Sequence, residues 1–183
     1  MITVFTTVLP TLLALSLGAA PAIAQTNPGA HQHGTAKLDL VFEAGSLSLD
    51  LDAPLDSLLG FERAPRTATE RAAADAALAR LRDAAALIRI DPAARCAAAA
   101  VTIQSTALLP VKRAAKPLQA ASEHADVEVA YRFKCEGTAP AWVDLGLFEA
   151  FARLQRIEVQ LSTAKGQRKQ MLIRPAKRIA LAH

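Results

Sequence analysis

Alternating apolar and polar residues identify the first structural unit of this 183-residue chain. Residues 36–42 and 46–52 both alternate with a period of two, and Glu43-Ala44-Gly45 between them is typical of a turn. The pattern therefore predicts a β-hairpin. One face of its second strand carries the apolar side chains that we expect to be buried, which are Leu47, Leu49 and Leu51.

Further strands are predicted in the second half of the chain. Residues 126–133 alternate in the same way. The apolar face of this segment comprises Val127, Val129, Tyr131 and Phe133. Residues 97–104 have the character of an alanine-rich strand. Short runs on either side of an Ala164-Lys165-Gly166 turn, and one near the end of the sequence, indicate strands at 156–163, 167–173 and 177–181.

Two segments have helical spacing. Thr67 and Glu70 match a capping box, in which each side chain satisfies an exposed amide hydrogen of the first turn. The alanine- and arginine-rich run that follows predicts a helix to about Ile88. Its apolar stripe comprises Leu78, Leu81, Ala85 and Ile88. Residues 142–154 predict a second helix with Trp142 inward. Hairpin-paired strands and two packed helices make an α+β fold with an antiparallel sheet.

Residues 1–24 have the features of a secretory signal peptide. They carry no charged side chain and end in an A-x-A-like cleavage site at Ala22 and Ala24. The alternative is a retained membrane anchor, which needs about 20 apolar residues. This apolar run is shorter and is interrupted by proline. We therefore expect cleavage, no later transmembrane segment, and a single periplasmic α+β domain over residues 25–183.

The chain has two cysteines, Cys96 and Cys135. In an exported protein the oxidising compartment favours a disulfide between them. Such a bond would close a loop of about 40 residues, which the chain-entropy model values at about 4 kcal/mol. The alternative, a pair of thiolate metal ligands, fits an exported protein less well. We therefore predict a Cys96–Cys135 disulfide.

Composition and motifs argue against two classes of function. The formal net charge is +4, but aromatic residues make up only 4% of the chain and do not interleave with the basic stretches. A single-stranded nucleic-acid surface would need that interleaving, so we expect no nucleic-acid partner. The chain also lacks a nucleophile elbow, a phosphate-binding glycine loop and an H-E-x-x-H motif. We therefore expect that the protein is not an enzyme.

Histidine spacing offers the strongest chemical signal. His31 and His33 are two residues apart, so on an extended backbone both imidazoles point to the same side. His124 and Asp126 repeat this spacing. If the two short segments meet, three imidazoles and a carboxylate could form a tetrahedral zinc site. Copper and nickel accept imidazole as readily. Because imidazole must be neutral to bind a metal, we expect affinity to fall below a pH of about 6.5.

An ordered set of short motifs resembles the zinc-regulated periplasmic ZrgA family. The motifs, in chain order, are Ala30-His31-Gln32-His33-Gly34, Leu59-Gly60-Phe61-Glu62, Pro92-Ala93-Ala94-x-Cys96, His124-Ala125-Asp126, Tyr131-x-Phe133-x-Cys135, Leu147-Phe148-x-x-Phe151 and Ile157-Glu158-Val159-Gln160. The resemblance implies a periplasmic protein that binds zinc and assists zinc uptake, with a zinc-uptake transporter component as its partner. It also implies His31, His33 and His124 as zinc ligands.

The chain departs from the family pattern in one segment. Members often carry a long histidine- and aspartate-rich insertion near the position of residues 106–122, but here that segment is basic and has no histidine. A zinc store of many ions is therefore not expected on it. The departure favours an alternative function, a metal-free structural or interaction module of the cell envelope. We interpret Gly60-Phe61-Glu62 as structural, with Gly60 allowing an unusual backbone angle.

Overall fold

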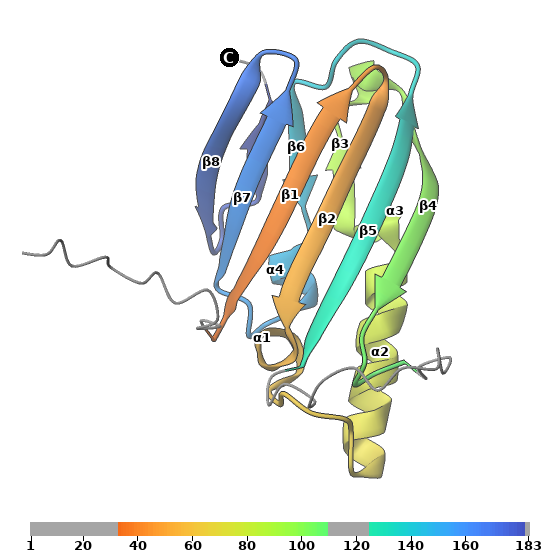
Figure 1. Ribbon diagram of the computed structural model, residues 1–183, viewed down its shortest axis with the longest axis vertical. Coiled ribbons are helices and arrows are strands. Elements are labelled where there is room, and N and C mark those ends of the chain that lie inside the picture. The colour runs from red at the N-terminus through yellow and green to blue at the C-terminus, as the bar shows by residue number, and fades with distance from the viewer. Residues whose placement is uncertain (1–32, 110–124, 182–183) are drawn as a thin grey trace, which may run out of the picture. The chain divides into compact units, whose positions relative to one another are not determined.

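Two β-sheets organise residues 33–109 and 125–181, the part of the chain described by the computed structural model (Figure 1). The larger sheet has the strand order β4-β5-β2-β1-β7-β8. Its strands are β1 (Thr35–Glu43), β2 (Ser46–Pro54), β4 (Cys96–Gln104), β5 (Asp126–Cys135), β7 (Arg156–Thr163) and β8 (Gly166–Ile173). The smaller sheet has the order β3-β6-β9, with β3 (Ile88–Ile90), β6 (Trp142–Leu145) and β9 (Arg178–Ala180).

The helices and the small sheet lie behind one face of the large sheet in Figure 1. The helices are α1 (Leu55–Leu59), α2 (Ala68–Arg82), α3 (Ala84–Leu87), α4 (Leu147–Ala150) and a 3-10 turn, η1 (Pro92–Ala94). Side chains from both layers form one apolar core. Tyr131 of β5 spans the layers, because its hydroxyl donates to the carbonyl oxygen of Leu81 in α2 at 2.9 Å. The α+β architecture predicted from the sequence is confirmed.

The predicted hairpin forms strands β1 and β2. They pair antiparallel, with Leu40 opposite Leu49 and Phe42 opposite Leu47. Leu47, Leu49 and Leu51 are almost fully buried, as the alternation predicted. The same alternation buries Val127, Val129, Tyr131 and Phe133 of β5. A slip of one residue would expose each of these faces, so the hydrophobic pattern fixes the register of the sheet.

One pair of neighbouring strands departs from the antiparallel arrangement. β1 runs parallel to β7, with Leu38 opposite Val159 and Leu40 opposite Leu161. Parallel neighbours need a long crossover connection. Here the connection includes most of the domain, because three other strands of the large sheet (β2, β4 and β5), two strands of the small sheet (β3 and β6) and all the helices lie between β1 and β7 in the sequence. Alternation within each strand cannot reveal this pairing, because it shows which face is buried but not which strand lies alongside.

The first predicted helix begins as expected and ends earlier. The Thr67 hydroxyl accepts from the Glu70 backbone N–H at 3.1 Å, and the Glu70 side chain completes the capping box. Hydrogen bonds from the Arg63 side chain and from the backbone N–H groups of Arg66 and Thr67, just before the helix, lower the pKa of Glu70 to about 2. The helix ends at Arg82, because the Asp83 side chain caps a new turn by accepting from the Ala86 N–H at 3.0 Å.

The break at Asp83 changes the predicted apolar stripe. Leu78 and Leu81 are buried as expected, but Ala85 is exposed. Ala84 and Leu87 are buried instead, in the separate turn α3 that follows the break. Ile88, which the pattern placed at the end of the helix, begins strand β3.

The second predicted helix, over residues 142–154, is wrong for most of its length. Residues 142–145 form strand β6 between β3 and β9, and only residues 147–150 are helical. Pairing on both sides overrides the helical spacing of the apolar residues. Trp142 is only partly buried, and the Arg178 guanidinium lies 4.2 Å from its ring centroid. Arg178 also pairs with the buried Asp144 at 2.7 Å and lowers the pKa of that carboxyl.

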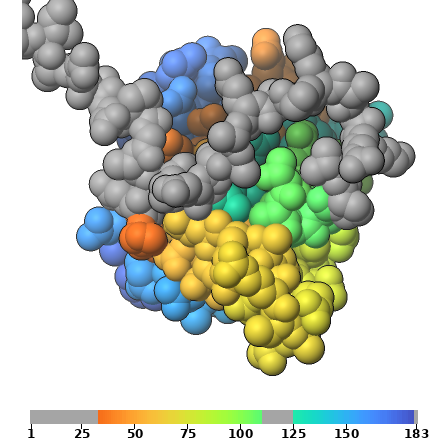
Figure 2. Space-filling view, turned by 60° about the horizontal axis from the view of Figure 1, so that its bottom comes forward, coloured from red at the N-terminus to blue at the C-terminus, as the bar shows by residue number. Residues whose placement is uncertain are grey.

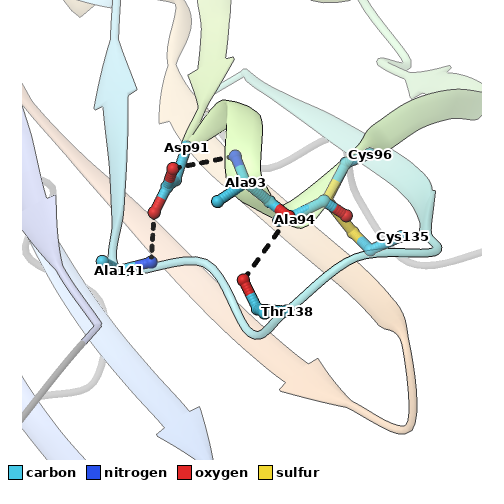
Figure 3. Close-up of a disulfide and its surroundings, with 7 residues drawn as sticks. All are labelled: Asp91, Ala93, Ala94, Cys96, Cys135, Thr138 and Ala141. Atoms are coloured by element: carbon cyan, nitrogen blue, oxygen red, sulfur yellow. Dashed lines mark hydrogen bonds between the residues drawn. A yellow bond between two sulfur atoms is a disulfide. The ribbon is translucent and has the colours of Figure 1, made fainter.

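The predicted disulfide is present at one end of β5 (Figure 3). Cys96 begins β4 and Cys135 ends β5, and the two residues are direct partners in the sheet. Beside the bond, the Asp91 carboxylate accepts from the backbone N–H groups of Ala93 and Ala141, each at 3.0 Å. These two hydrogen bonds, with that from Ala141 the stronger cause, lower the pKa of Asp91.

Candidate metal centre at the start of β1

His33 lies two residues before the first residue of β1 and contacts a carboxylate from α1. Its Nδ1 atom is 2.7 Å from Oδ2 of Asp56 and 3.9 Å from Oε1 of Glu62. The imidazole is 74% exposed, whereas the side chains of Asp56 and Glu62 are only 15% and 19% exposed. The ring therefore lies at the surface with one edge against a nearly covered pair of acidic groups.

The fold brings Asp56 to this position by a sharp change of direction. β2 ends at Pro54, and α1 starts at the next residue, so Asp56 lies in the first turn beside the start of β1. Arg153 holds it from the other side. The Arg153 Nε donates to the carbonyl oxygen of Asp56 at 3.0 Å, and its Nη2 lies 3.4 Å from Oδ1. Both the backbone and the side chain of Asp56 are thereby fixed.

Ser57 fixes the backbone on which His33 is placed. The Gly34 N–H donates to the Ser57 hydroxyl at 3.0 Å, and this hydroxyl donates in turn to the Thr35 carbonyl oxygen at 3.2 Å. Ser57 is fully buried, so both hydrogen bonds are shielded from water. Gly34 has a φ of 74°, in the left-handed region that favours glycine. The chain therefore enters β1 through a defined turn.

The contact between His33 and Asp56 determines which ring nitrogen carries hydrogen. An ionised carboxylate can only accept, so the hydrogen of this bond must belong to Nδ1. In the neutral imidazole the lone pair then lies on Nε2. A carboxylate that accepts from one ring nitrogen, while the other nitrogen binds metal, is the usual partner of a zinc-ligating histidine. In this arrangement Nε2 of His33 is the ring nitrogen with a lone pair that a metal ion could bind.

The other predicted ligands are placed only in part. His31 and His124 lie outside the described residues. Asp126 begins β5 and is half-buried, opposite Pro54 in the register of β2 and β5. The carbonyl oxygen of Ala125, the residue after His124, accepts from the Leu55 N–H beside Asp56 at 2.9 Å. The starts of β1 and β5 thus lie at one end of the sheet, with β2 between them.

Two residues near His33 were not predicted as parts of the site. Asp56 is a single carboxylate in an apolar connection, and its contact with His33 spans 23 residues, which no spacing rule detects. Glu62 belongs to the Gly60-Phe61-Glu62 segment that the sequence suggested to be structural. Gly60 has the predicted unusual backbone angle, with a φ of 87°. Among residues 33–109 and 125–181, no group of three or more His, Cys, Asp or Glu side chains could hold a metal ion.

Figure 2 shows this end of the molecule, where the start of β1 (orange) lies close to α1 (gold) and to the segment that leads into β7 (light blue). That segment bonds to the turn before β1, because the N–H groups of Gln155 and Arg156 donate to the Gly34 carbonyl oxygen at 2.7 and 3.0 Å. In the same described part of the chain, no helix is long and apolar enough to cross a membrane.

Comparison with known proteins supports the assignment suggested by the motifs. No curated protein matches the chain significantly. A family described as "ZrgA family zinc uptake protein" matches residues 30–181, which include both sheets, the disulfide and the His33–Asp56 contact. This match covers most of the sequence. The chain therefore belongs to the ZrgA family of zinc uptake proteins.

Proposed function

We propose that this protein is a non-enzymatic zinc-binding protein of the periplasm that assists zinc uptake, and that it binds zinc through Nε2 of His33. The observation that carries the proposal is the 2.7 Å contact between His33 Nδ1 and Asp56. The family is described by zinc uptake. A histidine oriented by a carboxylate is the kind of ligand that zinc sites use.

The exposure of His33 suits a protein that takes up and passes on zinc. Its ring is 74% exposed, so an incoming ion can reach Nε2 without a rearrangement of the core. Asp56, by contrast, is nearly covered and held by Arg153. The ligand is thus accessible while the group that orients it is fixed. This combination favours a site that binds zinc and can release it to a transporter component.

The remaining ligands in the proposal are those predicted from the sequence, His31 and His124, with Asp126 or water completing the set. The topology supports this choice. β1 and β5 start at the same end of the sheet, separated by one strand, which corresponds to roughly 10 Å or two strand spacings. His31 precedes β1 by four residues and His124 precedes β5 by two. Copper or nickel could occupy the same set of nitrogen ligands.

Zinc titration of the isolated protein tests the proposal. We expect one zinc ion per chain by isothermal titration near neutral pH. His33→Ala should weaken binding at least about 10-fold, and Asp56→Asn about 10-fold, which is the usual cost of losing an orienting partner. Asp50→Asn is the matched control, because Asp50 pairs with Arg132 on the sheet, away from His33. Wild-type protein that binds no zinc, or His33→Ala protein that binds as wild type does, would contradict the proposal.

A thermal melt separates this function from the metal-free interaction module. A ligand that binds only the folded state raises the melting temperature with its concentration. We expect added zinc to raise the midpoint of wild-type protein and a chelator to reverse the shift. An equal midpoint under both conditions would favour the metal-free module. Cell fractionation, with mass determination of the mature chain, tests export and cleavage after Ala24.

A further inference from the structure

We infer that Arg153 is a positioning residue of this zinc site, and that it acts on His33 through Asp56. The inference rests on the proposed function, because it assumes that His33 binds zinc. Arg153 lies 97 residues after Asp56 in the chain, in the connection between α4 and β7. It does not belong to any of the histidine motifs. Its role follows from three sets of contacts.

The first set divides the Asp56 carboxylate between two partners. Oδ2 lies 2.7 Å from Nδ1 of His33, and Oδ1 lies 3.4 Å from Nη2 of Arg153. The Arg153 Nε donates to the carbonyl oxygen of the same residue at 3.0 Å. The planar guanidinium therefore contacts the backbone and the carboxylate of Asp56 together, which a lysine ammonium cannot reproduce. This contact favours the orientation in which Oδ2 faces the imidazole.

The second set of contacts explains why residue 60 is a glycine. A Cβ atom at this position would lie 3.1 to 3.3 Å from the guanidinium atoms of Arg153. Such distances are tighter than ordinary contacts, so a larger residue would push the guanidinium away from Asp56. The φ of 87° at Gly60 adds strain for any other residue. Gly60 therefore provides both the turn after α1 and the space that Arg153 occupies.

The third set joins the backbone near Arg153 to the turn that carries His33. Gln155 and Arg156 donate to the Gly34 carbonyl oxygen, and Gly34 is the residue after His33. His33, Asp56 and Arg153 thus form a closed circuit of contacts, completed by the backbone bonds to Gly34. Removal of the Arg153 side chain breaks its contacts with the carboxylate and the carbonyl oxygen of Asp56. The carbonyl oxygen still accepts from the Gly60 N–H at 3.0 Å, and the backbone bonds to Gly34 remain, so the carboxylate loses more than the backbone does. The expected effect is therefore on the imidazole and its affinity for zinc.

The experiment compares Arg153→Ala with Arg156→Ala, the matched control. Arg156 is exposed and only three residues away, and no hydrogen bond or ion pair joins its guanidinium to Asp56 within the described residues. We expect Arg153→Ala to weaken zinc binding about 3- to 10-fold, less than loss of Asp56 itself. Arg153→Lys should recover only part of the loss, and Arg156→Ala should bind as wild type does.

Nitrogen-15 NMR of the histidine ring provides a readout that a purely structural role would not move. In zinc-free wild-type protein, His33 should carry its hydrogen on Nδ1, and in Arg153→Ala protein the Nε2–H tautomer should increase. Unchanged zinc affinity and tautomer in Arg153→Ala protein, with a wild-type protein that does bind zinc through His33, would overturn the inference alone. Zinc binding that does not depend on His33 would overturn the proposed function.

Discussion

Two carboxylates that lie near opposite ends of strand β5, those of Asp91 and Asp56, have opposite roles. At the end of β5, beside the disulfide, both oxygens of Asp91 accept from backbone N–H groups, so the carboxylate only joins parts of the chain. At the start of β5, the Asp56 carboxylate is shared between Arg153 and an imidazole that is 74% exposed. The first carboxylate stabilises the fold, and the second orients an exposed imidazole that, in the proposed function, binds zinc.

This comparison teaches how to separate structural from functional polar groups in the molecule. A group whose hydrogen bonds all end on backbone atoms away from His33 contributes to stability alone. A group that orients an exposed side chain contributes to binding. Substitutions at the disulfide end should therefore change the free energy of unfolding and leave zinc affinity unchanged, whereas substitutions near His33 should change zinc affinity.

The largest effect on stability is expected from removal of the disulfide. The double substitution Cys96→Ala/Cys135→Ala frees a loop between residues separated by 39 positions, and the chain-entropy model gives a loss of about 4 kcal/mol in the free energy of unfolding. Urea denaturation measures this loss. Zinc affinity, measured at a temperature where the variant is folded, should stay that of wild type. A parallel loss of zinc affinity would break the comparison.

Gly137→Ala should produce the next largest effect. A Cβ atom at this position would overlap the backbone of Ala93 and Ala94, which has no flexible end to move aside. Overpacking of this kind costs about 2–3 kcal/mol. Gly166→Ala is the control for space alone, because nothing lies within 4 Å of a Cβ atom there, although its φ of 129° adds some strain. Urea denaturation of both variants should show the larger loss for Gly137→Ala.

Ser57→Ala tests the His33 end and should act on both properties. It leaves the Gly34 N–H and the Thr35 carbonyl without their buried partner, which costs about 1–2 kcal/mol. Because the same bonds fix the turn after His33, we expect zinc affinity to fall as well. Ser48→Ala, on the partly exposed face of β2, is the control. Lost stability with unchanged zinc affinity would show that the turn does not position His33.

The smallest effect is expected from Asp91→Asn, and it should depend on pH. Backbone hydrogen bonds lower the pKa of Asp91, so its carboxylate stabilises the fold above the ordinary aspartate pKa of about 3.9. This contribution is lost as the pH falls through the lower pKa of the folded protein. The melting temperatures of wild type and variant should therefore differ at pH 7 and converge in acid. A constant difference at every pH would contradict this explanation, and zinc affinity should not change.

The sequence predicted strands more reliably than helices, for a physical reason. Leu47, Leu49 and Leu51 face one core, so their alternation fixes both the strand and its buried face. Residues 142–154 carry helical spacing, but β3 and β9 pair with residues 142–145 on both sides. For such a segment, the strands that pair with it decide whether it is a strand or a helix. The sequence alone does not show those partners.

The candidate site could be predicted only in part, because the sequence does not show which distant residues contact His33. His33 stood out because histidines are rare in this chain and His31 lies two positions away. Asp56 and Arg153 carry no such signal, because aspartate and arginine are common and their contacts with the site span 23 and 97 residues. His33 could be proposed as a ligand from its chemistry, but its contact with Asp56, and that of Asp56 with Arg153, became evident only from the folded chain.

The parallel pairing of β1 with β7 has a consequence for synthesis. When the hairpin has been made, one edge of β1 stays unpaired until about 110 further residues have been translated, since β2 ends at Pro54 and β7 ends at Thr163. An unpaired strand edge exposes backbone N–H and C=O groups that can pair with other nascent chains, and contacts between such distant segments form slowly. Arg153 and the residues that bond to Gly34 are made in the same late interval. A chain that terminates just before them would keep His33 and Asp56 but lack the residues that hold Asp56 and the turn at Gly34.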